Sequence, residues 1–160
     1  MWVVGVGYKH EHRDPAGENA KADILGLGSY DVKNVKTLQT YVIDGDLESG
    51  DAERIGRELL ADGVIQYFKF SHFSDDGSHA AFASASNAWI VEVFFRPGVM
   101  DPVGLSVASA ISVLGVKSVR SVRTGTTYVI EGDLSESEVK AICEKCLAND
   151  LIQTYAYRRI

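Results

Sequence analysis

The chain has 160 residues, of which 46% are hydrophobic and 24% charged, with 15 glycines and only 3 prolines. This composition is typical of a globular protein and excludes disordered, collagen-like and disulfide-rich classes. The net charge of −6 has the wrong sign for a surface that binds nucleic acid by neutralising phosphates. No apolar run reaches the roughly 18–20 residues of a membrane span, and the N-terminal residues lack the charge order of a secretory signal, so we expect a cytoplasmic protein.

The first predicted elements are a strand and a helix. Residues Trp2–Tyr8 are rich in valine and aromatic residues, which favours a strand. Asp14-Pro15 predicts the start of a helix, because aspartate accepts hydrogen bonds from the first free N–H groups and proline fits the first helical position. The apolar residues that follow lie on one helical stripe, and Gly28 is expected to end the helix in a left-handed conformation: Ala16, Ala20, Ile24 and Leu27.

The sequence repeats itself at a shift of 87 residues without a gap. Trp2–Phe70 aligns with Trp89–Tyr157, and roughly a third of the aligned positions are identical. Between the copies, Ser71–Ala88 is rich in Ser, Ala, Asp and His and has no periodicity, which predicts a linker. The predicted organisation is therefore repeat 1 (1–70), a linker (71–88) and repeat 2 (89–160).

The second repeat shows the element order most clearly. We expect a strand at Trp89–Phe95 and then a helix from Asp101-Pro102 to Gly115. Two strands should follow, around Val119–Arg123 and Thr127–Glu131, joined by a tight hairpin at Thr124–Thr126. A helix from Ser135 and a last strand at Ile152–Tyr157 complete the repeat. Ser135 and Glu138 form a capping box. The apolar stripe of this helix contains Val139, Ile142, Cys143, Cys146 and Leu147.

The order β-α-β-β-α-β predicts an α+β fold with both helices on one face of an antiparallel sheet. The other face is apolar as well, since Ile90 and Phe94 alternate with Trp89 and Val91. A unit of about 70 residues buries only about 60% of the surface of its unfolded chain. We therefore predict a pseudo-dimer with the two sheets packed together and the helices outside. Its expected inter-repeat core contains Trp2, Val4, Tyr41, Trp89, Val91 and Tyr128.

Residue patterns that suggest metal or redox chemistry are better explained by structure. Cys143 and Cys146 have CxxC spacing, but they lie on the apolar stripe of a helix, where core packing is the simpler role. His10-x-His12-x-Asp14 has the spacing of metal ligands, yet Asp14 is already assigned as a helix cap. We therefore predict no catalytic residue, no metal site and no bound cofactor.

Basic residues alternate along one predicted strand of repeat 2. Lys117, Arg120 and Arg123 either form a solvated strand edge or a basic strip for an anionic ligand or an acidic partner surface. Both interpretations stay open at the level of sequence.

Three segments of repeat 2 together resemble one known family. They are residues 96–104 (RPGVMDPVG), 119–125 (VRSVRTG) and 144–152 (EKCLANDLI), with Leu114-Gly115 between the first two. These segments are similar to PurS, the small subunit of phosphoribosylformylglycinamidine synthase. The resemblance covers essentially all of repeat 2 and, through the internal repeat, repeat 1 more weakly.

The resemblance implies a non-catalytic subunit that dimerises and bridges a synthetase subunit (PurL) and a glutaminase subunit (PurQ). Together these convert formylglycinamide ribonucleotide, glutamine and ATP into formylglycinamidine ribonucleotide in purine synthesis, as an ATP-dependent ligase with glutamine as amide donor. ATP, Mg and glutamine would be used by the complex and not bound by this chain. The tandem is similar to the N-terminal domain of the long, single-chain form of the enzyme, which resembles a fused PurS pair.

The resemblance also suggests where partners would bind. Candidate partner contacts are Asp14, Arg96, Pro97, Gly98, Asp101, Arg120, Arg123, Thr124 and Gly125. Two departures weaken parts of this assignment. Repeat 1 has Lys9–Arg13 (KHEHR) where repeat 2 has Arg96–Met100, and Thr126 stands where the family often has lysine.

An alternative function remains from the element order alone. Regulatory domains of the ACT type share the order β-α-β-β-α-β, often occur in tandem and bind amino acids between units. An RNA-binding domain of the RRM type has a similar order, but the net charge of −6 and the lack of an aromatic RNP1 segment disfavour it.

Overall fold

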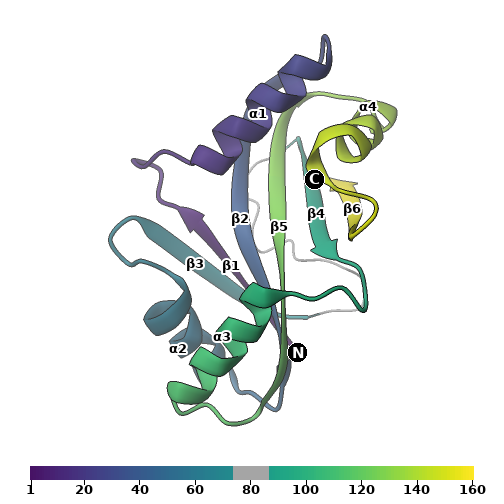
Figure 1. The fold of residues 1–160 in the computed structure, drawn as a ribbon. Coiled ribbons are helices and arrows are strands. Elements are labelled where there is room, and N and C mark those ends of the chain that lie inside the picture. Colours follow the sequence, from purple (N-terminus) through teal and green to yellow (C-terminus); the bar gives the residue numbers. More distant parts are fainter. Residues whose placement is uncertain (74–86) are drawn as a thin grey trace. The chain divides into compact units, whose positions relative to one another are not determined.

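The computed structural model describes residues 1–73 and 87–160, so most of the predicted linker lies outside the described residues. Within these described residues each half contributes three strands and two helices, whose arrangement is drawn in Figure 1. The second helix of each half ends in a π-helical turn. The elements of the first half are β1 (Trp2–Tyr8), α1 (Pro15–Leu27), β2 (Asp31–Gly45), α2 (Ser49–Ile55) with its turn Gly56–Leu60, and β3 (Gln66–His72). Those of the second half are β4 (Ala88–Phe95), α3 (Pro102–Val113), β5 (Val119–Asp133), α4 (Glu136–Ile142) with its turn Cys143–Leu147, and β6 (Gln153–Arg159). The α+β class is confirmed.

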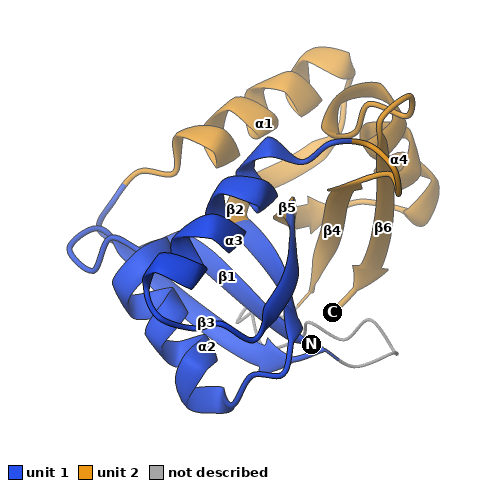
Figure 2. Cartoon of the chain, turned by 60° about the horizontal axis from the view of Figure 1, so that its bottom comes forward, with its two compact units in different colours: residues 1–12, 39–82, 100–124 blue, residues 13–38, 83–99, 125–160 orange. Residues whose placement is uncertain are grey.

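The chain forms two compact units, and each unit takes elements from both repeats (Figure 2). Among the described residues, unit 1 contains 1–12, 39–73 and 100–124, and unit 2 contains 13–38, 87–99 and 125–160. Helix α1 and the first part of β2, from repeat 1, therefore belong to unit 2. Helix α3 and the first part of β5, from repeat 2, belong to unit 1. The repeats describe the sequence, while the compact units cross their boundaries.

The strands are antiparallel, and their register is the same in both units. Hydrogen-bonded strands follow the order β3-β1-β2-β5-β4-β6. In unit 1, Val4 of β1 lies opposite Tyr41 and Phe70. In unit 2, Val91 of β4 lies opposite Tyr128 and Tyr157, the residues that the sequence repeat aligns with Tyr41 and Phe70.

The predicted hairpin at Thr124–Thr126 is wrong, because β5 continues through these residues. Gly125 pairs with Phe94 and Thr126 with Val93, so the segment is strand interior. A Cβ on Gly125 would lie 2.5 Å from the carbonyl oxygen of Val93, which explains the glycine by close packing and not by a turn. The two predicted strands are the two halves of one strand, which passes from unit 1 to unit 2 after Thr124.

The predicted helix starts are confirmed, and one of the two predicted glycine ends is wrong. Asp14 and Asp101 are the N-caps of α1 and α3, and Ser135 forms a capping box with Glu138. Gly115 has φ +99°, the left-handed conformation expected after a helix. Gly28 is extended instead, with φ 161°, and the chain enters β2 only three residues later, at Asp31.

Each unit has one core beneath its helices, and each core combines residues of both repeats. In unit 1, residues from repeat 1 pack with residues from α3, the loop after it and β5: Val4, Val6, Ile43 and Ile55 with Ile111, Val116 and Val122. In unit 2, α1 and β2 supply the repeat 1 residues: Ala20, Ile24, Val32 and Val35 with Trp89, Val91, Val93, Ile130, Leu134, Val139, Ile142, Cys143 and Leu147. Tyr41 and Tyr128 pack against these cores.

Among the inter-repeat core candidates, Val4 lies in the core of unit 1, and Trp89 and Val91 lie in the core of unit 2. Trp2 is half-buried and donates its indole N–H to the carbonyl of Leu47, at 2.9 Å, as Trp89 does to Leu134, at 3.1 Å. The opposite face of β1 is buried too, since Val3 has no exposed surface. The six described strands belong to one hydrogen-bonded sheet, and face-to-face packing of its two halves stays a prediction.

Candidate interaction site

A carboxylate at the start of each first helix ties the helix to the following long strand. Asp101 accepts hydrogen bonds from the backbone N–H of Gly104 at 2.8 Å, from the N–H of Thr124 at 2.6 Å and from the Thr124 hydroxyl at 2.9 Å. Asp14 accepts the same set from Gly17 and Thr37, at 2.9, 2.6 and 2.9 Å. We name each arrangement the Asp–Thr bridge.

The Asp–Thr bridges give three of the predicted partner contacts a structural role. Both carboxylate oxygens of Asp14 and Asp101 accept bonds from the chain itself, and Thr124 is only 4% exposed. The helix can approach the strand because Gly17 and Gly104 have no Cβ, which would overlap the carbonyl oxygens of Val35 and Val122. The Asp-Pro-x-Gly motif is thus explained by helix packing, and a partner contact at these residues stays a prediction.

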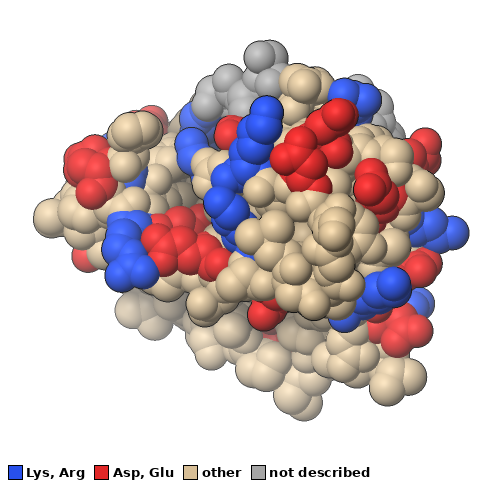
Figure 3. Space-filling view, turned by 90° about the horizontal axis from the view of Figure 1, so that it is seen from above, with Lys and Arg blue, Asp and Glu red and all other residues tan. Residues whose placement is uncertain are grey.

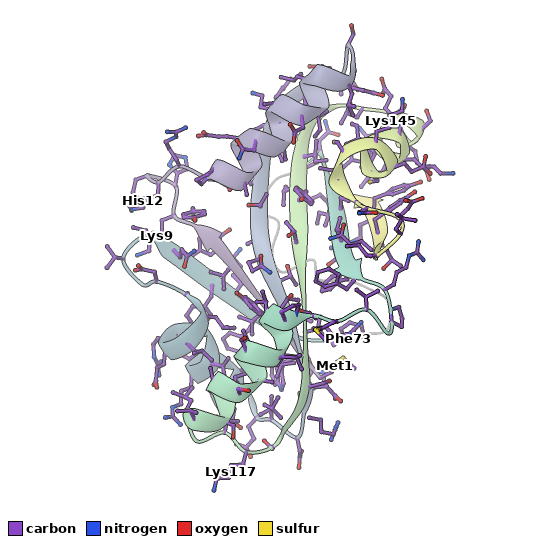
Figure 4. The ribbon with its side chains drawn as sticks, viewed as in Figure 1. Met1, Lys9, His12, Phe73, Lys117 and Lys145 are labelled. Atoms are coloured by element: carbon purple, nitrogen blue, oxygen red, sulfur yellow. The ribbon has the colours of Figure 1, made fainter. Side chains whose placement is uncertain are left out.

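The loop after the first strand of each repeat is fixed by a basic residue. Arg96 donates its Nε–H to the carbonyl of Asp150 and its backbone N–H to the carbonyl of Ile152, both at 2.8 Å. Lys9, labelled in Figure 4, donates Nζ to the carbonyl of Gly63 at 2.6 Å. Pro97 and Gly98 are exposed, and Gly98 has φ +84°. Arg96 is exposed as well, so all three residues of the predicted contact loop reach the surface while the arginine anchors the loop.

The basic strip of β5 is partly neutralised within unit 1. Arg120 forms a two-pronged ion pair with Asp44, with Nη2–Oδ1 and Nε–Oδ2 distances of 2.8 and 3.1 Å. Its guanidinium lowers the pKa of Asp44 through a side-chain hydrogen bond. Arg123 and Lys117 are exposed, and Figure 4 shows Lys117 projecting from the loop before β5. On the face drawn in Figure 3, basic and acidic side chains are interspersed, without a broad region of one sign.

The residues that could carry metal or thiol chemistry have surroundings that suit other roles. Cys143 is fully buried, and burial raises the pKa of its thiol to about 12, while burial also raises the pKa of Cys146. Asp14 is engaged in its bridge, and His10 and His12 are exposed. Over residues 1–73 and 87–160, no group of three His, Cys, Asp or Glu side chains could hold a metal ion. In the same ranges, no helix has the length and apolar character to cross a bilayer.

A groove in unit 1 is the site that the sequence did not reveal. It has a volume of about 410 Å³ and lies between α3 and the end of α2 with its π-helical turn. Its walls are Tyr41, Leu59 and Leu60 on one side and Pro102, Val103, Ser106, Val107 and Ala110 on the other. The two walls come from different repeats, so no sequence-local motif marks the groove.

Comparison with known proteins identifies one family in both halves of the chain. The sequence model of PurS, described as phosphoribosylformylglycinamidine (FGAM) synthase, matches residues 2–73 and again 88–160. Phosphoribosylformylglycinamidine synthase subunit PurS of Mycobacterium leprae is 33% identical over 72 residues, which are 44% of this chain and 91% of that protein. The subunit PurS of Archaeoglobus fulgidus is 35% identical over 71 residues, which are 41% of this chain and 89% of that protein.

A solved structure of B. subtilis PurS is also similar. It is 31% identical, covers 46% of this chain and 96% of its own chain, and has a TM-score of 0.43. Two separate matches to the family model account for nearly all of the sequence. The chain therefore belongs to the PurS family of phosphoribosylformylglycinamidine synthase and contains two copies of the family unit in tandem.

Proposed function

We propose that this chain is the assembly subunit of a phosphoribosylformylglycinamidine synthase, in which it bridges a PurL-like synthetase subunit and a PurQ-like glutaminase subunit. The complex would convert formylglycinamide ribonucleotide, glutamine and ATP into formylglycinamidine ribonucleotide in the cytoplasm. The observation that carries the proposal is the family match in both halves of the chain. The curated relatives are named as PurS subunits of this synthase.

A non-catalytic role fits the surroundings of the chemically capable residues. The thiol of Cys143 is protonated at neutral pH, and the carboxylates of Asp14 and Asp101 accept bonds that fix helices. In this proposal ATP, Mg and glutamine bind to the partner subunits. A tandem chain would take the place of a dimer of single PurS subunits, because each of its compact units combines both repeats.

Reconstitution tests the proposal. PurL-like and PurQ-like subunits from the same organism are assayed for amidation with and without this chain, using glutamine in one series and ammonium in a second. We expect the chain to be required with glutamine and to co-elute with both subunits when glutamine and Mg-ADP are present. Ammonium-dependent amidation should depend on it less, because ammonium bypasses the glutaminase. Equal glutamine-dependent rates with and without the chain would refute the assembly role.

A further inference from the structure

Helix α3 has no charged residue, although much of it faces outward. From Pro102 to Val113 its sequence is PVGLSVASAISV. Exposed apolar side chains follow its length: Val103 is 51% exposed, Leu105 62% and Val113 89%, and Met100 just before the helix is 72% exposed. Exposed apolar residues gathered on one element are a known mark of interaction surfaces.

The matching helix α1 shows that the fold does not require this apolar surface. Both helices begin with the same Asp–Thr bridge, and both bury an isoleucine at the same place, Ile24 in α1 and Ile111 in α3. Their outward residues differ, because Glu18 stands where α3 has Leu105 and Asp23 stands where it has Ala110. Since equal packing tolerates charge at these places, packing within the unit does not explain their apolar character in α3.

The groove beside α3 also differs in charge from the matching place beside α1. Its walls in unit 1 are apolar except for the hydroxyl groups of Tyr41 and Ser106. At the matching place in unit 2, α1 has Asp23 where α3 has Ala110, and the pKa of Tyr128 is raised by burial, then by Cys146 and then by the carboxylate of Asp23. A partner segment that fits the groove beside α3 would therefore meet a carboxylate at the matching place beside α1. An apolar contact there would remove water from that carboxylate without giving it a partner, which is unfavourable.

We propose that the α3 groove binds an uncharged, apolar segment of a partner subunit of the synthase, and that each tandem chain has one such site and not two. The inference rests on the proposed function and names the surface that carries it out. An uncharged helix offers no partner to a charged side chain, so the complementary segment is apolar and uncharged where it enters the groove. Insertion of a few apolar side chains beside a helix is a common mode of recognition.

A second copy of this chain fits the surface less well. A stable interface buries about 800 Å² from each partner, which is more surface than the four exposed apolar side chains at α3 can supply by themselves: Met100, Val103, Leu105 and Val113. Each copy also carries a net charge of −6, which repels another copy. A larger subunit can add contacts around the groove, whereas a symmetric contact limited to α3 cannot.

Charge substitutions in α3, with a matched control in α1, test the inference. Val103→Glu and Ala110→Asp each place a carboxylate on a wall of the groove, and Ala110→Asp gives α3 the residue that α1 has at this place. Leu25→Glu in α1 also places a carboxylate at an exposed apolar helix position, since Leu25 is 46% exposed and Val103 51% exposed in the parent chain. We expect the α3 variants to bind the partner subunits at least about tenfold more weakly, and Leu25→Glu to bind within about twofold of the parent. Unchanged thermal unfolding midpoints would show that all variants fold.

The outcomes separate this inference from the proposed function. If the parent chain binds the partner subunits and Val103→Glu binds equally well, the α3 site is refuted while the assembly role stands. If the parent chain binds no partner subunit, both are refuted. Sedimentation of the chain alone tests whether a second copy occupies the groove. A concentration-dependent dimer that Val103→Glu abolishes would assign the groove to a second copy and overturn the proposal.

Discussion

A single carboxylate joins each first helix to the long strand that follows it, and this role can be tested at the level of one atom. Asp101→Asn keeps the size of the side chain but replaces one acceptor oxygen with an N–H donor, so Gly104 or Thr124 loses its acceptor. We expect the free energy of unfolding to fall by about 1–3 kcal/mol, the usual range for hydrogen bonds to a charged group. Urea denaturation measures the change as a lower midpoint with an unchanged slope.

The control for this substitution is Asp133→Asn, which makes the same chemical change at an exposed position near the end of β5. It should change the free energy of unfolding by less than about 0.5 kcal/mol. An equal effect of both substitutions would show that loss of negative charge, and not the Asp–Thr bridge, determines the result.

The buried thiol of Cys143 predicts a dependence of stability on alkaline pH. Its pKa is raised from an ordinary value of 9.0 to about 12 by burial, so the folded chain keeps a proton that the unfolded chain releases above about pH 9. The contribution of this group to stability is complete below pH 9 and is lost as the pH rises towards 12. Urea denaturation at pH 8 and pH 11 should show a smaller loss of stability in Cys143→Ala than in the parent chain. Equal losses would contradict the raised pKa.

At the scale of elements, close helix–strand contact depends on the third helical position. A Cβ on Gly104 would overlap the carbonyl oxygen of Val122, which is backbone and cannot rotate away. We expect Gly104→Ala to lower the free energy of unfolding by about 1–3 kcal/mol through overpacking. The matched control is Gly26→Ala in α1, where a Cβ meets nothing within 4 Å and alanine favours the helix by about 0.5–1 kcal/mol. Thermal or urea unfolding of both variants decides whether space or helix propensity dominates.

The elements also show what the sequence could predict and why it failed elsewhere. The sequence was sufficient to predict features that depend on neighbouring residues only. The Asp-Pro helix starts, the Ser135 capping box and the left-handed Gly115 are each determined by residues within one helical turn. The hairpin at Thr124–Thr126 failed because glycine between threonines has the same local signature whether it turns or packs. Its real cause, the carbonyl of Val93, lies more than thirty residues away in the sequence.

The candidate site was hidden for the same physical reason. Tyr41 and Leu59 on one wall of the groove and Val107 on the other come from different repeats, and only folding brings them together. The exposed valines and leucine of α3 resemble an ordinary apolar stripe in the sequence. A comparison of the two helices position by position, Leu105 with Glu18 and Ala110 with Asp23, was the available signal for a special surface.

At the scale of the whole molecule, the composition of the compact units predicts that neither repeat is sufficient alone. Residues 1–73 would lack α3, the loop after it and the first part of β5, which supply Ile111, Val116 and Val122 to the core of unit 1. Residues 88–160 would lack α1, which supplies Ala20 and Ile24 to the core of unit 2. We expect each half, expressed separately, to be poorly folded as a monomer, because a core that loses several buried aliphatic side chains loses more than the 5–15 kcal/mol that typically stabilises a domain.

Mixing the two halves should then restore the fold, since together they contain every segment of both units. The measurement is the dispersion of amide signals in NMR spectra of each half and of the equimolar mixture, with sedimentation to give the mass of the species formed. Each half can also pair with itself, as the repeated sequence allows, and this would appear as a folded homodimer. Either result requires association before folding, because the missing helix must come from a second molecule. A half that is monomeric and gives well-dispersed amide signals would show that a repeat completes its own core. The segments assigned to the other unit would then fold back onto their own repeat.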